Sequence, residues 1–322
     1  MRWLAIIGWL ILCCLPLQAQ DQSETETDKG YLTGFLESNL SGIGRTVTIE
    51  GFQGALSSRA TFTELAIADD AGVWIRFRDG AISWNRGALL SGRVEIAELS
   101  AAQIELLRKP SSGEAQADYS GFSLPDLPVS VSIGQLRADR VILAPEVLGQ
   151  EAVVSIQGRA DLAGGAGSAD FSLSRVDGKD GALTFSGSYA NATGEATLDL
   201  LAKEGPGGVA ATILNLPGVP AAELALHGSG TFADFRTDLA LSTDNVPRIR
   251  GQLTTTAPPG ADGRTGDRRF SLALNGDISP LLSETYGDFF GTAVSLEADG
   301  THRVDGQVDL TRMVLKSPGV DL

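Results

Sequence analysis

Alternation of apolar and polar residues is the main pattern of this chain. From about residue 43 onward, runs such as Val47-Thr48-Ile49 and Leu198-Asp199-Leu200 place every second side chain on one apolar face. Alternation with a period of two predicts β-strands that have one apolar and one polar face. We count about sixteen such runs, separated by turn sequences such as Asp79-Gly80 and Asn275-Gly276. The sequence therefore predicts an all-β fold, mainly antiparallel, over residues 43–322.

A few segments depart from this pattern. Apolar residues recur at helical spacing between residues 29 and 42, which predicts a short amphipathic helix there. Brief interruptions at 85–90, 208–216 and 279–290 predict helical turns, and segments 111–118 and 257–267 are expected to be loops. The apolar phases of Phe62 and Leu65 disagree, which predicts a β-bulge between them.

So many strands pose a problem of burial. About sixteen strands paired in sequence would extend about 75 Å, and open twisted sheets rarely exceed about ten strands without curling or splitting. The predicted helices are too few to cover the apolar face. Three solutions remain: a sandwich of two sheets, a β-solenoid, or a long curved and twisted sheet that forms a groove with an apolar interior. A groove of that length would suit acyl chains better than a small polar substrate.

The N-terminus resembles an export signal. Residues 1–19 combine a basic start, an apolar stretch and a small residue, Ala19, before Gln20. About 15 helical residues reach only about 22 Å, less than a bilayer core, which favours cleavage, but retention as a membrane anchor stays open. Residues 20–28 are a polar spacer. The sequence predicts export to the periplasm, with residues 1–19 acting as a signal peptide or an anchor.

Composition and charge exclude several classes of function. There are 40 Asp and Glu against 25 Lys and Arg, which gives a formal net charge of −15. Such a balance argues against nucleic acid as a partner and against a polybasic membrane patch. With 2 His, and with Cys13 and Cys14 as the only cysteines, a Cys/His metal cluster is not available. No catalytic constellation is recognisable, so we expect no enzyme activity, no metal and no cofactor.

The N-terminal half carries a more specific pattern. Residues 45–60 read RTVTIEGFQGALSSRA, residues 67–75 read IADDAGVWI, and residues 82–93 read ISWNRGALLSGR. The runs IELLRKP at 104–110 and LPV at 127–129 follow in order. Over residues 40–145, this succession resembles the opening of the TamB family, which belongs with the AsmA-like proteins. The rest of the chain resembles the family only in its general style of sequence.

The resemblance implies a fold, a role and partners. TamB-like proteins are attached to the inner membrane, span the periplasm and contain a long β-sheet with an apolar groove. The family implies phospholipid transport between the inner and outer membranes within the translocation and assembly module. It also implies partnership with the outer-membrane barrel protein TamA in protein secretion and outer-membrane biogenesis. Family members are far longer, so this chain is expected to be an N-terminal portion that lacks the region contacting TamA.

We expect acyl chains to lie on twelve apolar residues of the predicted strands. These residues are Ile49, Ile67, Ile75, Phe77, Ile96, Leu106, Val131, Ile156, Leu173, Phe185, Leu200 and Leu226. Two other functions stay open. One is a scaffold whose exposed sheet edge pairs with strands of outer-membrane proteins or autotransporters, acting with TamA. The other is a secreted β-solenoid adhesin or a glycan-binding protein or enzyme, which would need a carboxylate cluster on one rung.

Overall fold

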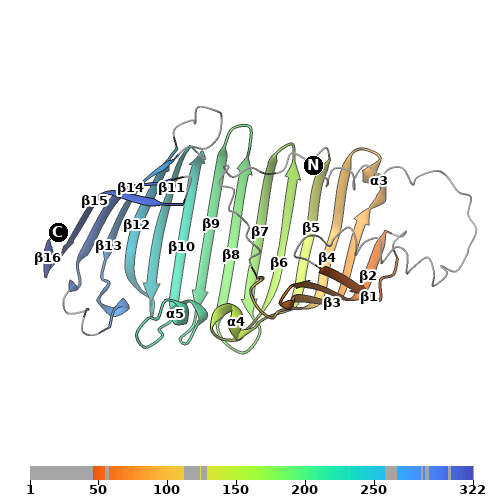
Figure 1. Ribbon diagram of the computed structural model, residues 1–322, viewed down its shortest axis with the longest axis horizontal. Coiled ribbons are helices and arrows are strands. Elements are labelled where there is room, and N and C mark those ends of the chain that lie inside the picture. Colours follow the sequence, from red (N-terminus) through yellow and green to blue (C-terminus); the bar gives the residue numbers. More distant parts are fainter. Residues whose placement is uncertain are drawn as a thin grey trace, which may run out of the picture.

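The protein forms one long sheet whose strands follow the order of the sequence (Figure 1). The computed structural model describes residues 46–54, 58–111, 124, 129–231, 233–257, 267–283, 286, 290–303 and 306–321. The expected export signal, spacer and first helix, and most of the two expected loops, lie outside these residues. The predicted all-β fold with few, short helices is confirmed for the described part of the chain.

The strands are long and their connections are mostly short. The sheet contains β1 (Thr46–Glu50), β2 (Arg59–Asp69), β3 (Gly72–Asn85), β4 (Arg93–Leu106), β5 (Ser130–Leu143), β6 (Ala152–Ala163), β7 (Ala166–Arg175), β8 (Gly181–Ala190), β9 (Glu195–Glu204), β10 (Ala222–Thr231), β11 (Asp234–Thr243), β12 (Val246–Thr256), β13 (Arg268–Gly276), β14 (Val294–His302), β15 (Val308–Ser317) and β16 (Val320–Asp321).

Helical turns occur where the alternation stops. They are α3 (Arg86–Leu89), α4 (Pro145–Leu148), α5 (Val209–Ile213) and the 3-10 turn η1 (Ser279–Leu281). Three of them fall within the interruptions predicted from the sequence, whereas α4 was not predicted. Both α4 and α5 lie along one edge of the sheet, the lower edge in Figure 1, and α3 lies at the opposite edge.

One pair of neighbouring strands is parallel. β4 and β5 run in the same direction, while every other neighbouring pair is antiparallel. A parallel pair needs a connection that returns along the length of the strands. Residues 107–129 make this connection, and its start is tied to the β2–β3 turn because Asp69 accepts a hydrogen bond from the Ser111 amide at 2.7 Å and pairs with Arg108.

A row of bulges crosses the first strands of the sheet. Thr63, Asp79, Ala102 and Asp139 are left out of the pairing of β2, β3, β4 and β5, and Asp79 has a φ of 48°. The extra residue in each strand shifts the alternation by one position. Apolar side chains before and after it therefore point to the same face of the sheet. The bulge expected between Phe62 and Leu65 is therefore present, at Thr63, and the same face stays apolar across it.

Phenylalanine rings lie close to glycines of the neighbouring strand. Phe171 covers Gly158, and a Cβ added to Gly158 would lie 2.3 Å from the Phe171 ring. The same arrangement joins Phe62 with Gly80, Phe235 with Gly228, and Phe270 with Gly300. A ring that packs on a glycine across two strands covers backbone that would otherwise be exposed to water.

The polar face of β2–β4 is stabilised by four alternating charges. Arg76 lies 3.2 Å from Glu64 and 3.0 Å from Glu105, while Arg78 lies 3.1 Å from Glu105 and 3.6 Å from Glu64. Burial by itself would raise the pKa of Glu105. The hydrogen bonds from Arg76 and Gln103 and the charge of Arg78 outweigh that effect and hold the pKa of Glu105 below its usual value.

Glu105→Gln is expected to lower the free energy of unfolding by about 1–2 kcal/mol at pH 7, because two arginines lose a charged acceptor. A depressed pKa stabilises the fold above the unfolded pKa of about 4.3, and this contribution is lost as the pH falls through the folded value. The difference between wild type and variant should thus shrink in acid. Urea titrations at several pH values measure it.

Glu223→Gln serves as the control for this experiment. Glu223 pairs with Lys203 at 2.8 Å, but both side chains are largely exposed, at 42 % and 55 %. Exposed pairs of this kind contribute less than about 1 kcal/mol. An equal effect of the two substitutions, or a difference that does not depend on pH, would contradict the stabilising role of the Glu105 cluster.

Candidate functional site

A continuous row of apolar side chains crosses the sheet from strand to strand. Residues directly opposite one another in neighbouring strands point to the same face. Phe171 of β7 is paired with Phe185 of β8, and Leu200, Leu226 and Leu239 continue the row through β9, β10 and β11. Beyond Gly251 of β12 the row resumes in β13, β14 and β15 with Leu274, Leu296 and Leu315. We call this set the central row.

The residues predicted from alternation all lie on the face of the central row. Phe185, Leu200 and Leu226 belong to the row itself, and Ile156 and Leu173 are paired with each other in the next row of the same face. The pairing of β1 to β6 places the remaining predicted positions on the same face, in rows beside the central row. These positions are Ile49, Ile67, Ile75, Phe77, Ile96, Leu106 and Val131. Their role in binding acyl chains stays a prediction.

The prediction missed other members of the face. Phe171, Leu239, Leu274 and Leu296 occupy the central row, and the alternation of their strands contained the signal that could have identified them. Trp84 also lies on this face, opposite Ile96. Leu124 could not have been found in this way, because it belongs to the connection between β4 and β5.

The large apolar side chains of this face remain partly exposed. Apart from Ile49, which is buried, the predicted residues are half-buried, and the buried apolar residues of the described chain are mostly alanines. Every substantial contact between elements joins neighbours in the sheet, or α3 with β4. Within the described residues, no second sheet or helix therefore covers the apolar face.

One described contact from outside the sheet reaches this face. The backbone of Leu124 is held by the side chain of Asn191, which donates to the Leu124 carbonyl at 2.7 Å and accepts from its amide at 2.9 Å. The Leu124 side chain lies against Gly167, which is paired with Leu162 on the apolar face. The connection between the parallel strands thus touches the apolar face near one end of β7.

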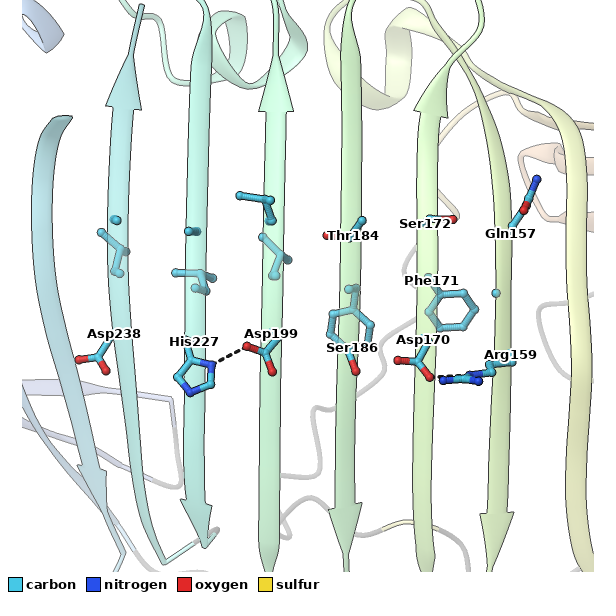
Figure 2. Close-up of a pocket in the computed structure, with 18 of the residues that line it drawn as sticks. Gln157, Arg159, Asp170, Phe171, Ser172, Thr184, Ser186, Asp199, His227 and Asp238 are labelled. Atoms are coloured by element: carbon cyan, nitrogen blue, oxygen red, sulfur yellow. Dashed lines mark hydrogen bonds and ion pairs between the residues drawn. The ribbon is translucent and has the colours of Figure 1, made fainter. Parts of the chain in front are cut away.

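A hollow of about 1030 Å³ follows the central row across β5–β12. Each strand from β6 to β11 contributes three consecutive residues to its lining, centred on the central row. Consecutive strand residues point to opposite faces. The three residues from each strand are therefore one residue of the apolar face and its two neighbours, many of them polar, on the other face. Figure 2 shows these neighbours aligned from strand to strand.

The polar neighbours include two pairs of a basic and an acidic side chain on adjacent strands, and we call these polar neighbours the ladder. Arg159 donates to Asp170 at 2.8 Å, and His227 pairs with Asp199, as the dashed lines in Figure 2 mark. The hydrogen bond to Asp199, together with its negative charge, raises the pKa of the His227 imidazole. The side chains of both pairs are largely exposed, so the ladder is a solvated face.

At one end of the described sheet, apolar side chains of β15 have no neighbouring strand on one side. Among the described residues, β16 pairs with Lys316 and Ser317 of β15 and with no other part of that strand. The apolar residues Val308, Leu310 and Met313 of β15 are therefore more than half exposed, at 56 %, 58 % and 56 %.

Comparison with known proteins gives no relative for this chain: no family model, curated protein or solved structure matches it. Among the described residues, no group of three or more His, Cys, Asp and Glu side chains could hold a metal ion. In the same part of the chain, no helix has the length and apolar character needed to cross a membrane.

Proposed function

We propose that this protein binds lipid and carries it along the apolar face, with acyl chains on the central row and headgroups toward water. The observation that carries the proposal is a face of half-exposed Leu, Ile and Phe side chains that extends from β2 to β15 in the described residues. Apolar surface of this extent is rarely left in water, because burying it stabilises by about 25 cal/mol per Å². Acyl chains supply a cover that the described chain does not.

The cellular role follows from the resemblance of residues 40–145 to the TamB family and from the export signal. We propose a periplasmic bridge attached to the inner membrane, carrying phospholipid toward the outer membrane as part of the translocation and assembly module. TamA would be contacted through a region beyond this chain. The role is one of binding and transport, without catalysis.

Purification of the protein from a Gram-negative host without detergent, followed by mass spectrometry of organic extracts, tests the proposal. We expect phospholipid in a defined molar ratio to protein, and none with an unrelated periplasmic protein of similar charge prepared alongside. Protein that is folded and free of lipid would contradict the proposal.

Within the described residues, most of β15 has no partner strand on its outer side, and this favours a second candidate. An edge strand with exposed apolar residues is a template for an added strand, which would suit a scaffold for outer-membrane proteins. That role predicts crosslinks from β15 to unfolded barrel proteins and no lipid in the purified protein. The same purification therefore separates the two candidates.

A further inference from the structure

The hollow that follows the central row lies on the polar face of the sheet. Ser172 and Thr184 are paired on the polar face and line the hollow, as do the other residues next to the central row in β6 to β11. Leu173 and Leu183 are paired on the apolar face beside the central row, and neither lines the hollow. The polar side chains are therefore its walls and the backbone of the central row is its floor. We call this hollow the polar trough.

The polar trough is long and narrow. Its volume of about 1030 Å³ matches the size of sites that hold small ligands. Neighbouring strands lie about 4.8 Å apart, so the trough extends about 24 Å from β6 to β11. Its walls come from strand residues two positions apart, which are separated by about 7 Å. Such a shape suits a single extended chain that lies across the strands.

The first wall offers hydrogen-bond donors and acceptors along its whole length. Arg159 donates to Asp170 at 2.8 Å, and His227 pairs with Asp199 two strands further on (Figure 2). Between these pairs, Ser186 is paired in the sheet with both Asp170 and Asp199. The carboxylates remain largely exposed, and each can accept further hydrogen bonds from a ligand.

The second wall is lower and less polar. It includes the small side chains of Ser172, Thr184, Ala225 and Ala240. These side chains leave room above the backbone, and their methyl and methylene groups can cover apolar atoms of a ligand. The two walls therefore suit a chain that is polar along one edge and less polar along the other.

The charges of the lining are close to balance. The lining contains two arginines, three aspartates and one histidine. A strongly anionic or cationic chain would gain little net attraction from such a set. The trough therefore favours an uncharged ligand rich in hydrogen-bonding groups.

The position of the trough on a sheet face disfavours a peptide. An extended peptide binds a sheet mainly through main-chain hydrogen bonds at an exposed edge. Along the floor of the trough, the N–H and C=O groups of β7 to β11 are already used in pairing between strands. The ligand must bond to side chains instead. Hydroxyl groups suit this task, because each can donate to a carboxylate and accept from a guanidinium.

We propose that the polar trough binds an extended, uncharged glycan of β-linked sugars that lies across β6 to β11. Its hydroxyls bond to the first wall, and its ring C–H groups pack on the second wall. Each sugar of such a chain advances by roughly the strand spacing of about 4.8 Å, so one sugar faces each strand. This site is on the opposite face from the proposed lipid site and is independent of it.

Calorimetric titration of the full chain with two hexasaccharides tests the proposal. Both cellohexaose and maltohexaose contain six glucose units, but β-1,4 linkages keep the first extended and α-1,4 linkages coil the second. We expect cellohexaose to bind roughly tenfold more tightly or better. Asp199→Ala should weaken its binding roughly tenfold, and Ser186→Ala about threefold. Asp199 is largely exposed, so the sheet should stay folded, and circular dichroism verifies this.

Asp299→Ala is the matched control. Asp299 also lies on the polar face and accepts a hydrogen bond from Ser271 at 2.7 Å, but it belongs to β14, beyond the lining of the trough. Its loss should leave cellohexaose binding unchanged. No binding of cellohexaose, equal affinity for the two hexasaccharides, or equal weakening by Asp199→Ala and Asp299→Ala would each overturn the proposal. A hexapeptide of alternating Ser and Gly is the third probe. If it binds more tightly than cellohexaose and depends on Asp199, the ligand is a peptide and the glycan assignment fails.

Discussion

Leu200→Asp is expected to remove lipid from the protein while leaving the sheet folded. Leu200 lies in the middle of the central row, directly opposite Phe185 and Leu226. An acyl chain lying on this row would cover the new carboxylate and separate it from water, at a cost of several kcal/mol. We expect lipid content and lipid transfer to fall roughly tenfold or more.

The sheet should tolerate this substitution because Leu200 is half-buried and packs in a single layer, so no closed core receives the charge. Mass spectrometry of the purified variant and transfer of fluorescent phospholipid between vesicles measure the effect. Circular dichroism verifies the β-sheet.

Leu201→Asp is the matched control. Leu201 is the next residue in β9 and lies on the polar face, opposite Thr184 and Ala225. Both variants carry the same added charge on a chain whose net charge is −15, so general repulsion of anionic lipid is equal in the two. Equal lipid content and transfer in both variants would show that the apolar face does not carry the acyl chains.

Gly276→Ala is expected to lower the free energy of unfolding by about 3 kcal/mol. A Cβ at this position would lie 1.8 Å from the Arg248 carbonyl oxygen, and φ is +153°. A side chain could turn away from such a clash, but this carbonyl belongs to the backbone of β12 between Pro247 and Ile249, which are both paired with β11. Gly276 is paired with Ile249 and Val294, so the strain would spread over β12, β13 and β14. Urea unfolding followed by circular dichroism measures the change.

Gly178→Ala separates this clash from backbone strain. Gly178 has a φ of +83°, but a Cβ there would meet nothing within 4 Å. The expected loss is about 1 kcal/mol, from the left-handed conformation alone. Both substitutions restrict the unfolded chain in the same way, so the difference between them reports the contact with Arg248 together with the greater strain of an alanine at a φ of +153°. If the two variants lose equal free energy of unfolding, β12 and β13 can move apart at Gly276 without destabilising the sheet.

The site was predictable where strands that follow one another in the sequence are also neighbours in the sheet. In β7–β11, alternation and turn residues identify each strand, and pairing in sequence then brings Leu173, Phe185, Leu200 and Leu226 to one face. The turns α3, α5 and η1 were predictable for the same reason, since they interrupt a regular period. Information of this kind is local and can be read from neighbouring residues.

Other features depend on contacts between residues far apart in the chain. The parallel pairing of β4 with β5 and the docking of Leu124 on Asn191 have no local signature, because the connecting segment shows no period of its own. The bulge at Thr63 was visible as a change of phase. Its continuation through Asp79, Ala102 and Asp139 appears only when the strands are placed side by side.

By itself, the sequence determined that this protein is built of strands with one apolar and one polar face, because a period of two leaves the backbone no other regular choice. Within each regular run it also determined which side chains share a face. Only the tertiary structure decided that the described strands form a single layer and that β4 and β5 run parallel. The number of layers and the direction of each pairing depend on twist, bulges and contacts across many strands, so they cannot be read from any single strand.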